Sequence, residues 1–150
     1  MSELAFNQND FHLWQLLTAH FVHYDAMHLM TNILALAILL YLFPPSPIDL
    51  VQRLVLSLIL IDIYLLVSDV EFYVGFSGLL YVIPGLAARH FLLKKEYWQL
   101  ILVILLLVFY VFILSTGTNI SGEIIWQPLK QAHLLGFAGG FIHFKHTTNS

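Results

Sequence analysis

Long apolar runs alternate along this chain with short polar or proline-containing breaks. The runs predict five apolar helices, at about residues 26–43, 54–67, 72–88, 97–114 and 130–144. A helix needs roughly 20 residues to cross the hydrocarbon core of a bilayer, so flanking polar residues have to complete several of them. Turn-forming residues fill the breaks at 44–47, 68–69 and 115–122. The pattern therefore predicts an all-α, polytopic membrane helical bundle, with residues 1–150 forming a single domain.

The composition supports a membrane environment and excludes several functions. Hydrophobic residues make up 59% of the chain and charged residues 10%, with a mean hydropathy of +0.83, which leaves too few charges to cover a water-soluble globule. A formal net charge of −3 without a basic run argues against a nucleic-acid partner. The absence of cysteine excludes disulfides, thiolate metal sites and cysteine nucleophiles. Residues 1–10 contain neither a basic nor an apolar stretch, so we expect no signal peptide.

The basic residues predict an orientation in the membrane. If the first run crosses from outside to inside, only Lys130 of the six lysines and arginines falls outside, as expected for a protein whose cytoplasmic loops are basic. Residues 1–25 then form an outer-side loop segment. Ser77 and His133 lie near the outer ends of their runs, at similar depth.

A serine and a histidine at the starts of two apolar runs are the first candidates for chemistry. Ser77 lies in the segment Gly75-Phe76-Ser77-Gly78, with Tyr81 one helical turn further on, and His133 shares a face with Gly136 and Gly140. A neutral imidazole within hydrogen-bond reach activates a serine, and glycines let two helices approach closely. Each motif alone also fits simple helix packing.

A third group of polar residues leads into the first apolar run. The spacing is Trp14-x3-Thr18-x4-His23-x4-His28-x3-Asn32, so His28 and Asn32 lie one helical turn apart on the same face. Polar side chains at membrane depth usually face the protein interior or a water-filled cavity. With the Ser77 backbone N–H, these two side chains suit the stabilisation of an oxyanion. The alternative is that both only form interhelical hydrogen bonds.

In order, spacing and membrane placement, these motifs resemble the rhomboid intramembrane serine proteases over almost the whole chain. The resemblance implies a two-residue dyad, with Ser77 as the nucleophile and His133 as the general base. It also implies that Tyr81 packs against His133, and that His28, Asn32 and the Ser77 amide form the oxyanion hole. Gly75 and Gly78 would support this site, while Gly136 and Gly140 would pack the helices.

The resemblance also implies an activity and a location. Such an enzyme is a serine endopeptidase that cleaves transmembrane segments of membrane proteins near the outer face of the bilayer. We expect an integral protein of a bacterial inner (cytoplasmic) membrane that works on transmembrane substrates and lipid, with its active site toward the outer face. Neither a cofactor nor a metal is expected.

The chain departs from the family pattern in two places. Gln15 follows Trp14 where the family often has arginine, and no apolar run precedes Trp14 although the usual bacterial core has six spans. We therefore expect that a first span is missing. Tyr73-Val74-Gly75 and the stretch 94–98 resemble the rhombosortase branch, which processes C-terminal Gly-Gly anchor signals. Tyr81, however, stands where many of that branch have histidine.

Other functions fit some of these residues. A catalytically silent rhomboid-like module would bind membrane helices, although such relatives typically lack the serine or the histidine. A bis-histidine haem protein would use residues such as His28 and His133 as axial ligands. His20, His23 and His28 have a faint metal-ligand spacing without carboxylate or thiolate companions. Asp62, within the second run, is either functional or hydrogen-bonded to a tyrosine or serine in the interior.

Overall fold

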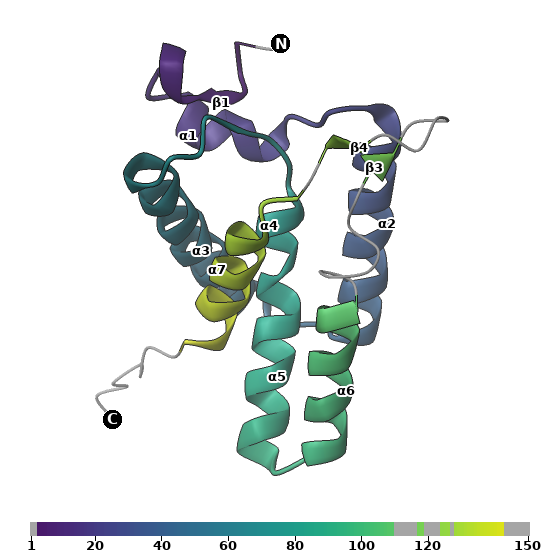
Figure 1. Ribbon diagram of the computed structural model, residues 1–150. Coiled ribbons are helices and arrows are strands. Elements are labelled where there is room, and N and C mark those ends of the chain that lie inside the picture. The colour runs from purple at the N-terminus through teal and green to yellow at the C-terminus, as the bar shows by residue number, and fades with distance from the viewer. Residues whose placement is uncertain (1–2, 110–116, 119–123, 127, 143–150) are drawn as a thin grey trace, which may run out of the picture.

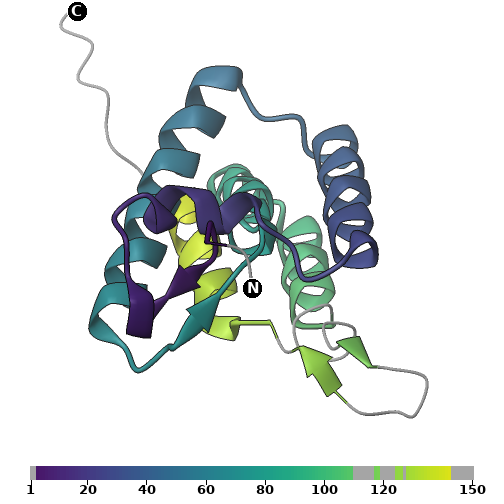
Figure 2. The same ribbon diagram turned by 90° about the horizontal axis from the view of Figure 1, so that it is seen from above.

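Five long helices build the molecule, which we describe from a computed structural model of residues 3–109, 117–118, 124–126 and 128–142. The long helices are α2 (Ala26–Leu42), α3 (Pro47–Val67), α5 (Val82–Lys94), α6 (Tyr97–Phe109) and α7 (Lys130–Phe141). The short helix α4 (Ser77–Leu80) leads directly into α5. Viewed from above, α4 and α5 lie centrally, with α3 on one side and α2 and α6 on the other (Figures 1 and 2). Helix α7 packs against α3, α4 and α5 and closes the core.

Helix α3 begins earlier than the hydropathy pattern predicts. The predicted run starts at residue 54, whereas the helix starts at Pro47. Ser46 caps it by accepting a hydrogen bond from the Asp49 N–H, and proline is well tolerated at the first helical position because its missing N–H would have no partner there. Pro47, the last residue of the predicted break at 44–47, is therefore the first residue of the helix.

The third apolar run, predicted as a helix over 72–88, is divided. Phe72–Tyr73 is a short strand, β2, and helical structure begins only at Ser77. The helix is interrupted at Tyr81, between α4 and α5, and continues to Lys94. Lys95 ends it in the left-handed conformation, with φ 60°. The nucleophile candidate thus lies at the first residue of a helix, after a loop.

The segment predicted as an outer loop, 1–25, contains regular structure in its described part. It holds strand β1 (Phe6–Asn7), two 3-10 turns, η1 (Gln8–Asp10) and η2 (Ala19–Phe21), and the short helix α1 (Gln15–Thr18). Strand β1 pairs antiparallel with β2, with Phe6 opposite Tyr73. The N-terminal segment is therefore joined directly to the chain that leads to Ser77.

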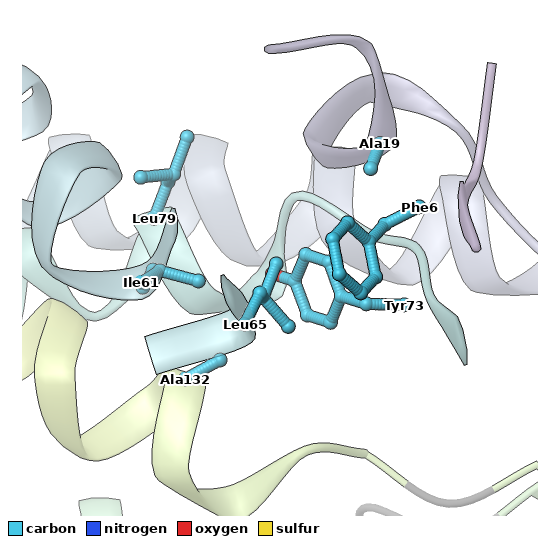
Figure 3. Packing of buried hydrophobic residues seen from close by; sticks show 7 residues of the cluster. All are labelled: Phe6, Ala19, Ile61, Leu65, Tyr73, Leu79 and Ala132. Carbon is cyan, nitrogen blue, oxygen red and sulfur yellow. The ribbon is translucent and has the colours of Figure 1, made fainter. Parts of the chain in front are cut away.

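A buried apolar cluster lies beneath these strands. Phe6 and Tyr73 pack with side chains from α3, α4 and α7 (Figure 3). The cluster consists of Phe6, Ala19, Ile61, Leu65, Tyr73, Leu79 and Ala132. Because it joins six elements at one end of the bundle, it fixes the loop before Ser77 against the start of α7.

The fourth predicted helix and the loop after it are only partly described. Helix α6 is described to Phe109, and the predicted end at 114 lies outside the described residues. Strand β3 (Gly117–Thr118) lies within the predicted break at 115–122. It pairs antiparallel with strand β4 (Ile124–Trp126), which follows the break. The predicted end of the last run at 144 also lies outside the described residues, because α7 is described to Phe141.

The length of each helix bears on whether it can cross a membrane. Among the described residues, α3 alone is long and apolar enough to cross a bilayer by itself. Residues Gln15–Phe21 and Ala26–Leu42 qualify only as a pair, bent by 85°. The apolar helix Tyr97–Val108 is shorter than a span requires. The expected number of five spans therefore stays a prediction.

Candidate active site

Glycines set the distance between α7 and the helices α4, which begins at Ser77, and α5. A side-chain carbon on Gly136 would collide with the Gly78 carbonyl oxygen, and one on Gly140 with the Val82 carbonyl oxygen. From the other side, a carbon on Gly85 would collide with the Phe137 carbonyl. Backbone thus packs on backbone at these three glycines, as small residues at helix interfaces permit.

This close packing brings Ser77 and His133 together. The His133 Nε2 lies 2.9 Å from the Ser77 Oγ, within ordinary hydrogen-bond distance. The His133 ring stacks on Tyr81, with ring centroids 4.5 Å apart and planes 13° apart. The His133 side chain is 2% exposed, and its Nδ1 has no hydrogen-bond partner among the described residues. A serine and a histidine so placed can share a proton.

His28 reaches the same space from α2. The Asp25 side chain caps α2 by accepting from the His28 N–H at 2.7 Å. A side-chain carbon on Gly75 would lie 3.0 Å from the His28 Cε1, 3.3 Å from its Nε2 and 3.9 Å from the Ser77 Oγ. The edge of the His28 ring and the Ser77 hydroxyl therefore flank one small space. Only a residue without a side chain leaves that space open.

Asn32 lies one helical turn after His28 and is also buried, at 3% exposure. Its side-chain nitrogen Nδ2 has no hydrogen-bond partner among the described residues. Buried donors are almost always paired in native proteins, so such a donor marks a place where a water or a ligand oxygen can bind. The structure thus puts both predicted polar residues of α2 on its buried face.

The loop before Ser77 orients the Ser77 backbone amide. The carbonyl oxygen of Phe76 accepts hydrogen bonds from the N–H groups of Leu79 and Leu80, at 3.0 and 3.1 Å. Carbonyl and N–H point in opposite directions across a trans peptide, so the Ser77 N–H points away from the helix. Gly75 has a φ of +121°, a conformation that side chains disfavour.

A small cavity of about 30 Å³ adjoins the serine. Ser77 and His28 line it together with side chains of the N-terminal segment, of β2 and of the residues before α7. Its lining is Tyr24, His28, Phe72, Tyr73, Val74, Ser77, Pro128 and Leu129. A volume of this size accommodates one or two water molecules, so water can reach the hydroxyl of Ser77.

Sequence reasoning did not find two polar clusters beside this site. His20 is completely buried, and its Nε2 lies 3.1 Å from the Asp62 Oδ1. Asp62 therefore pairs with a histidine and not with the tyrosine or serine considered for it. Gln15 is buried and bonds four backbone groups of the N-terminal segment. A carboxylate in an apolar run and a histidine in the preceding loop were the available signals for the first cluster.

The histidines show no metal centre within the described part of the chain. No group of three or more histidine, cysteine, aspartate or glutamate side chains there is arranged to hold a metal ion. His23 packs edge to face on His28, with ring centroids 5.0 Å apart, while His20 bonds Asp62. Of the three histidines with metal-like spacing, His23 and His28 therefore contact each other, and His20 pairs with a carboxylate.

Comparison with family models identifies a domain that covers most of the chain. Residues 10–146 match the family model of the Rhomboid domain. A search of curated proteins and a search of solved structures found no match. The matched region covers most of the chain and includes Ser77, His133, His28 and Asn32.

Proposed function

The chain belongs to the rhomboid family of intramembrane proteases, and from this we propose that it is a serine endopeptidase with Ser77 as nucleophile and His133 as general base. The family fold is a polytopic helical membrane bundle, which agrees with the fold class predicted from the sequence. The observation that carries the proposal is the 2.9 Å contact between the Ser77 Oγ and the His133 Nε2.

The dyad works by proton transfer between these two side chains. The His133 Nε2 takes the proton of the Ser77 hydroxyl while the Oγ attacks the scissile carbonyl carbon. The resulting imidazolium then gives that proton to the leaving amine as the peptide bond breaks. Water hydrolyses the acyl-enzyme by the same steps in reverse. Stacking on Tyr81 keeps the imidazole plane aligned through these transfers.

The charge that develops on the substrate oxygen needs hydrogen-bond donors. Three donors are available: the Ser77 N–H, the Asn32 Nδ2 and the His28 ring. Two observations support this role, since the Asn32 Nδ2 lacks a partner among the described residues and the His28 ring borders the cavity beside Ser77. Each donor stabilises the transition state more than the ground-state carbonyl, which accelerates the reaction.

The substrates are transmembrane segments of other membrane proteins, cut near the outer face of the bilayer. A peptide bond inside a regular helix is not accessible to a serine, so the segment must unwind locally to reach Ser77. The predicted asymmetry of basic residues supports an outer position for the site, as does the place of Ser77 at the first residue of α4. We place the protein in the inner membrane of a bacterium.

Labelling with a fluorophosphonate probe tests the dyad. We expect Ser77→Ala and His133→Ala each to abolish both labelling and proteolysis without unfolding, because a nucleophile and its base act as a unit. Ser68→Ala and His90→Ala are matched controls outside the site and should label as the wild type does. Labelling retained in purified Ser77→Ala would refute the dyad, and a folded wild type that never labels would favour the silent helix-binding module.

The absence of cysteine makes the orientation directly testable. Single cysteines introduced as Asn9→Cys and Lys94→Cys lie at exposed positions on opposite predicted sides. With a membrane-impermeant maleimide on intact cells, we expect Asn9→Cys to react and Lys94→Cys to react only after permeabilisation. The reverse result would place the active site toward the cytoplasm.

A further inference from the structure

A row of buried polar side chains runs from α3 to the loop before Ser77 and takes no part in the proton transfers described above. Asp62, His20 and Tyr73 are 8%, 0% and 5% exposed. The His20 Nε2 lies 3.1 Å from the Asp62 Oδ1, and the His20 Nδ1 lies 3.5 Å from the Tyr73 hydroxyl. The same hydroxyl donates to the Gly75 carbonyl oxygen at 3.1 Å. Polar contacts thus link η2 to α3 and to β2.

Hydrogen counting gives this row a direction. If both His20 nitrogens carry hydrogen, Nε2 donates to the Asp62 carboxylate and Nδ1 donates to the Tyr73 oxygen. The single phenolic hydrogen of Tyr73 is then left for the Gly75 carbonyl, its shorter contact. In this arrangement each donor in the row has one acceptor.

The row ends on the backbone that presents the nucleophile. Gly75 is held on both sides, because its N–H donates to the Ala19 carbonyl at 2.9 Å and its carbonyl accepts from Tyr73. The Tyr73 hydroxyl would also lie 3.0 Å from a side-chain carbon on Gly78, one residue after Ser77. The Tyr73 hydroxyl is therefore bonded to the chain before the serine and lies close to the chain after it.

We propose that Asp62, His20 and Tyr73 form a positioning relay that holds the loop from Gly75 to Ser77 in its reactive geometry. The relay deepens the proposed function and rests on it, since it acts through Ser77. None of the three residues touches the reacting atoms, so none is a catalytic residue. Placing a nucleophile correctly accelerates a reaction because less ordering remains to be done in the transition state.

Removing only the phenolic oxygen tests the relay most directly. In Tyr73→Phe we expect the maximal rate of Ser77 acylation by a fluorophosphonate to fall roughly 3- to 10-fold, the factor that one neutral hydrogen bond provides. The half-saturating probe concentration should stay unchanged, because the oxygen removed is bonded to the Gly75 carbonyl and the aromatic ring that lines the cavity is retained. Tyr64→Phe removes the same atom from α3 away from the relay and should acylate like the wild type.

The role of Asp62 is tested through Tyr73. In Asp62→Asn the carboxylate acceptor of the His20 Nε2 is lost, so the placement of hydrogens in the row is no longer fixed; the Tyr73 hydroxyl hydrogen is then shared between His20 and Gly75, which slows acylation. In Tyr73→Phe there is no hydroxyl to redirect, so adding Asp62→Asn should lower the rate less than twofold further, a non-additivity expected of coupled residues. The measurements use the full chain in detergent, well below the midpoint of thermal unfolding of each variant.

Several outcomes would overturn the relay while leaving the dyad intact. One is wild-type acylation in Tyr73→Phe, including the case in which only its thermal stability falls, because the row would then be structural. Another is full additivity of Asp62→Asn and Tyr73→Phe, which would mean that Asp62 acts independently of Tyr73. Failure of the wild type itself to label would refute the proposed function instead.

Discussion

Helices α2 and α7 meet at the candidate active site from opposite sides and bury different kinds of residue. Helix α7 buries alanine, three glycines and one functional side chain, His133. Helix α2, with 17 residues, buries only two, and both are polar: His28 and Asn32. Its large apolar side chains, such as Met30 and Ile33, are exposed, and in Figure 2 it lies at the edge of the bundle.

The difference follows from the solvent that surrounds each helix. In a bilayer, apolar side chains gain little by leaving lipid, so apolarity does not decide which face of a helix turns inward. Helix α7 is placed by backbone contacts at its glycines, which tolerate little displacement. Helix α2 makes few such contacts, and it contributes two polar side chains, His28 and Asn32, to the site. We therefore expect substitutions in α2 to lower mainly the rate of acylation, and substitutions in α7 to lower mainly the stability of the fold.

The largest expected effect comes from the buried face of α2. Asn32→Ala or His28→Ala should slow Ser77 acylation by roughly 10²–10³, the usual loss when one oxyanion donor is removed. Thermal unfolding should change little, since neither side chain supports apolar packing. The measurement is the maximal fluorophosphonate acylation rate, with Ile33→Ala on the exposed face as the matched control. Unchanged rates in both variants would mean that these residues only form interhelical hydrogen bonds.

A smaller loss, expressed mainly in stability, is expected from α7. In Gly136→Ala the added methyl meets the Gly78 carbonyl, so α7 and α4 must separate. Overpacking of this kind costs about 1–3 kcal/mol in the free energy of unfolding, and acylation should fall with it because His133 moves with α7. Ala37→Val adds more volume at an exposed position of α2 and should be neutral. Equal stability of both variants, measured by unfolding in detergent, would mean that α7 is placed no more strictly than α2.

Much of the helical layout was predictable from the hydropathy pattern, because apolar runs and turn residues are local signals. The start of α3 at Pro47 was also encoded locally, by a serine cap followed by proline, but a proline run was interpreted as a break. The strand pairing of Phe6 with Tyr73 was not predictable in this way. Each strand has only two residues, too few for any alternation to register.

The candidate site also contains residues that the sequence identified and a contact that it did not. Ser77 and His133 were found because nucleophile and base have recognisable residue types and glycine spacings around them. The pairing of His20 with Asp62 joins positions 42 residues apart, and no periodicity in either segment identifies the partner of the other. The functional interpretation of Asp62 therefore needed the tertiary structure.

The smallest expected effect concerns Gln15, where the family pattern often has arginine. The Gln15 Oε1 accepts from the N–H groups of Asn7 and His12, both at 3.3 Å. Its Nε2 donates to the carbonyls of Glu3 and Asp10, at 3.3 and 3.2 Å. One amide thus fastens the N-terminal segment by four hydrogen bonds, near the end from which α2 enters the bundle.

Gln15→Ala would test whether α2 is held from its N-terminal end. We expect a loss of about 1 kcal/mol in the free energy of unfolding, because four long hydrogen bonds to partly buried backbone groups are replaced by water or left unmade. Proteolytic nicking before residue 13 should increase, while Ser77 acylation should fall less than about twofold, since neither Gln15 nor its partners contact the dyad. Gln99→Ala, at an exposed position of α6, is the matched control. A loss of acylation as large as that of Asn32→Ala would mean that the N-terminal segment sets the position of His28, and that α2 is as strictly placed as α7.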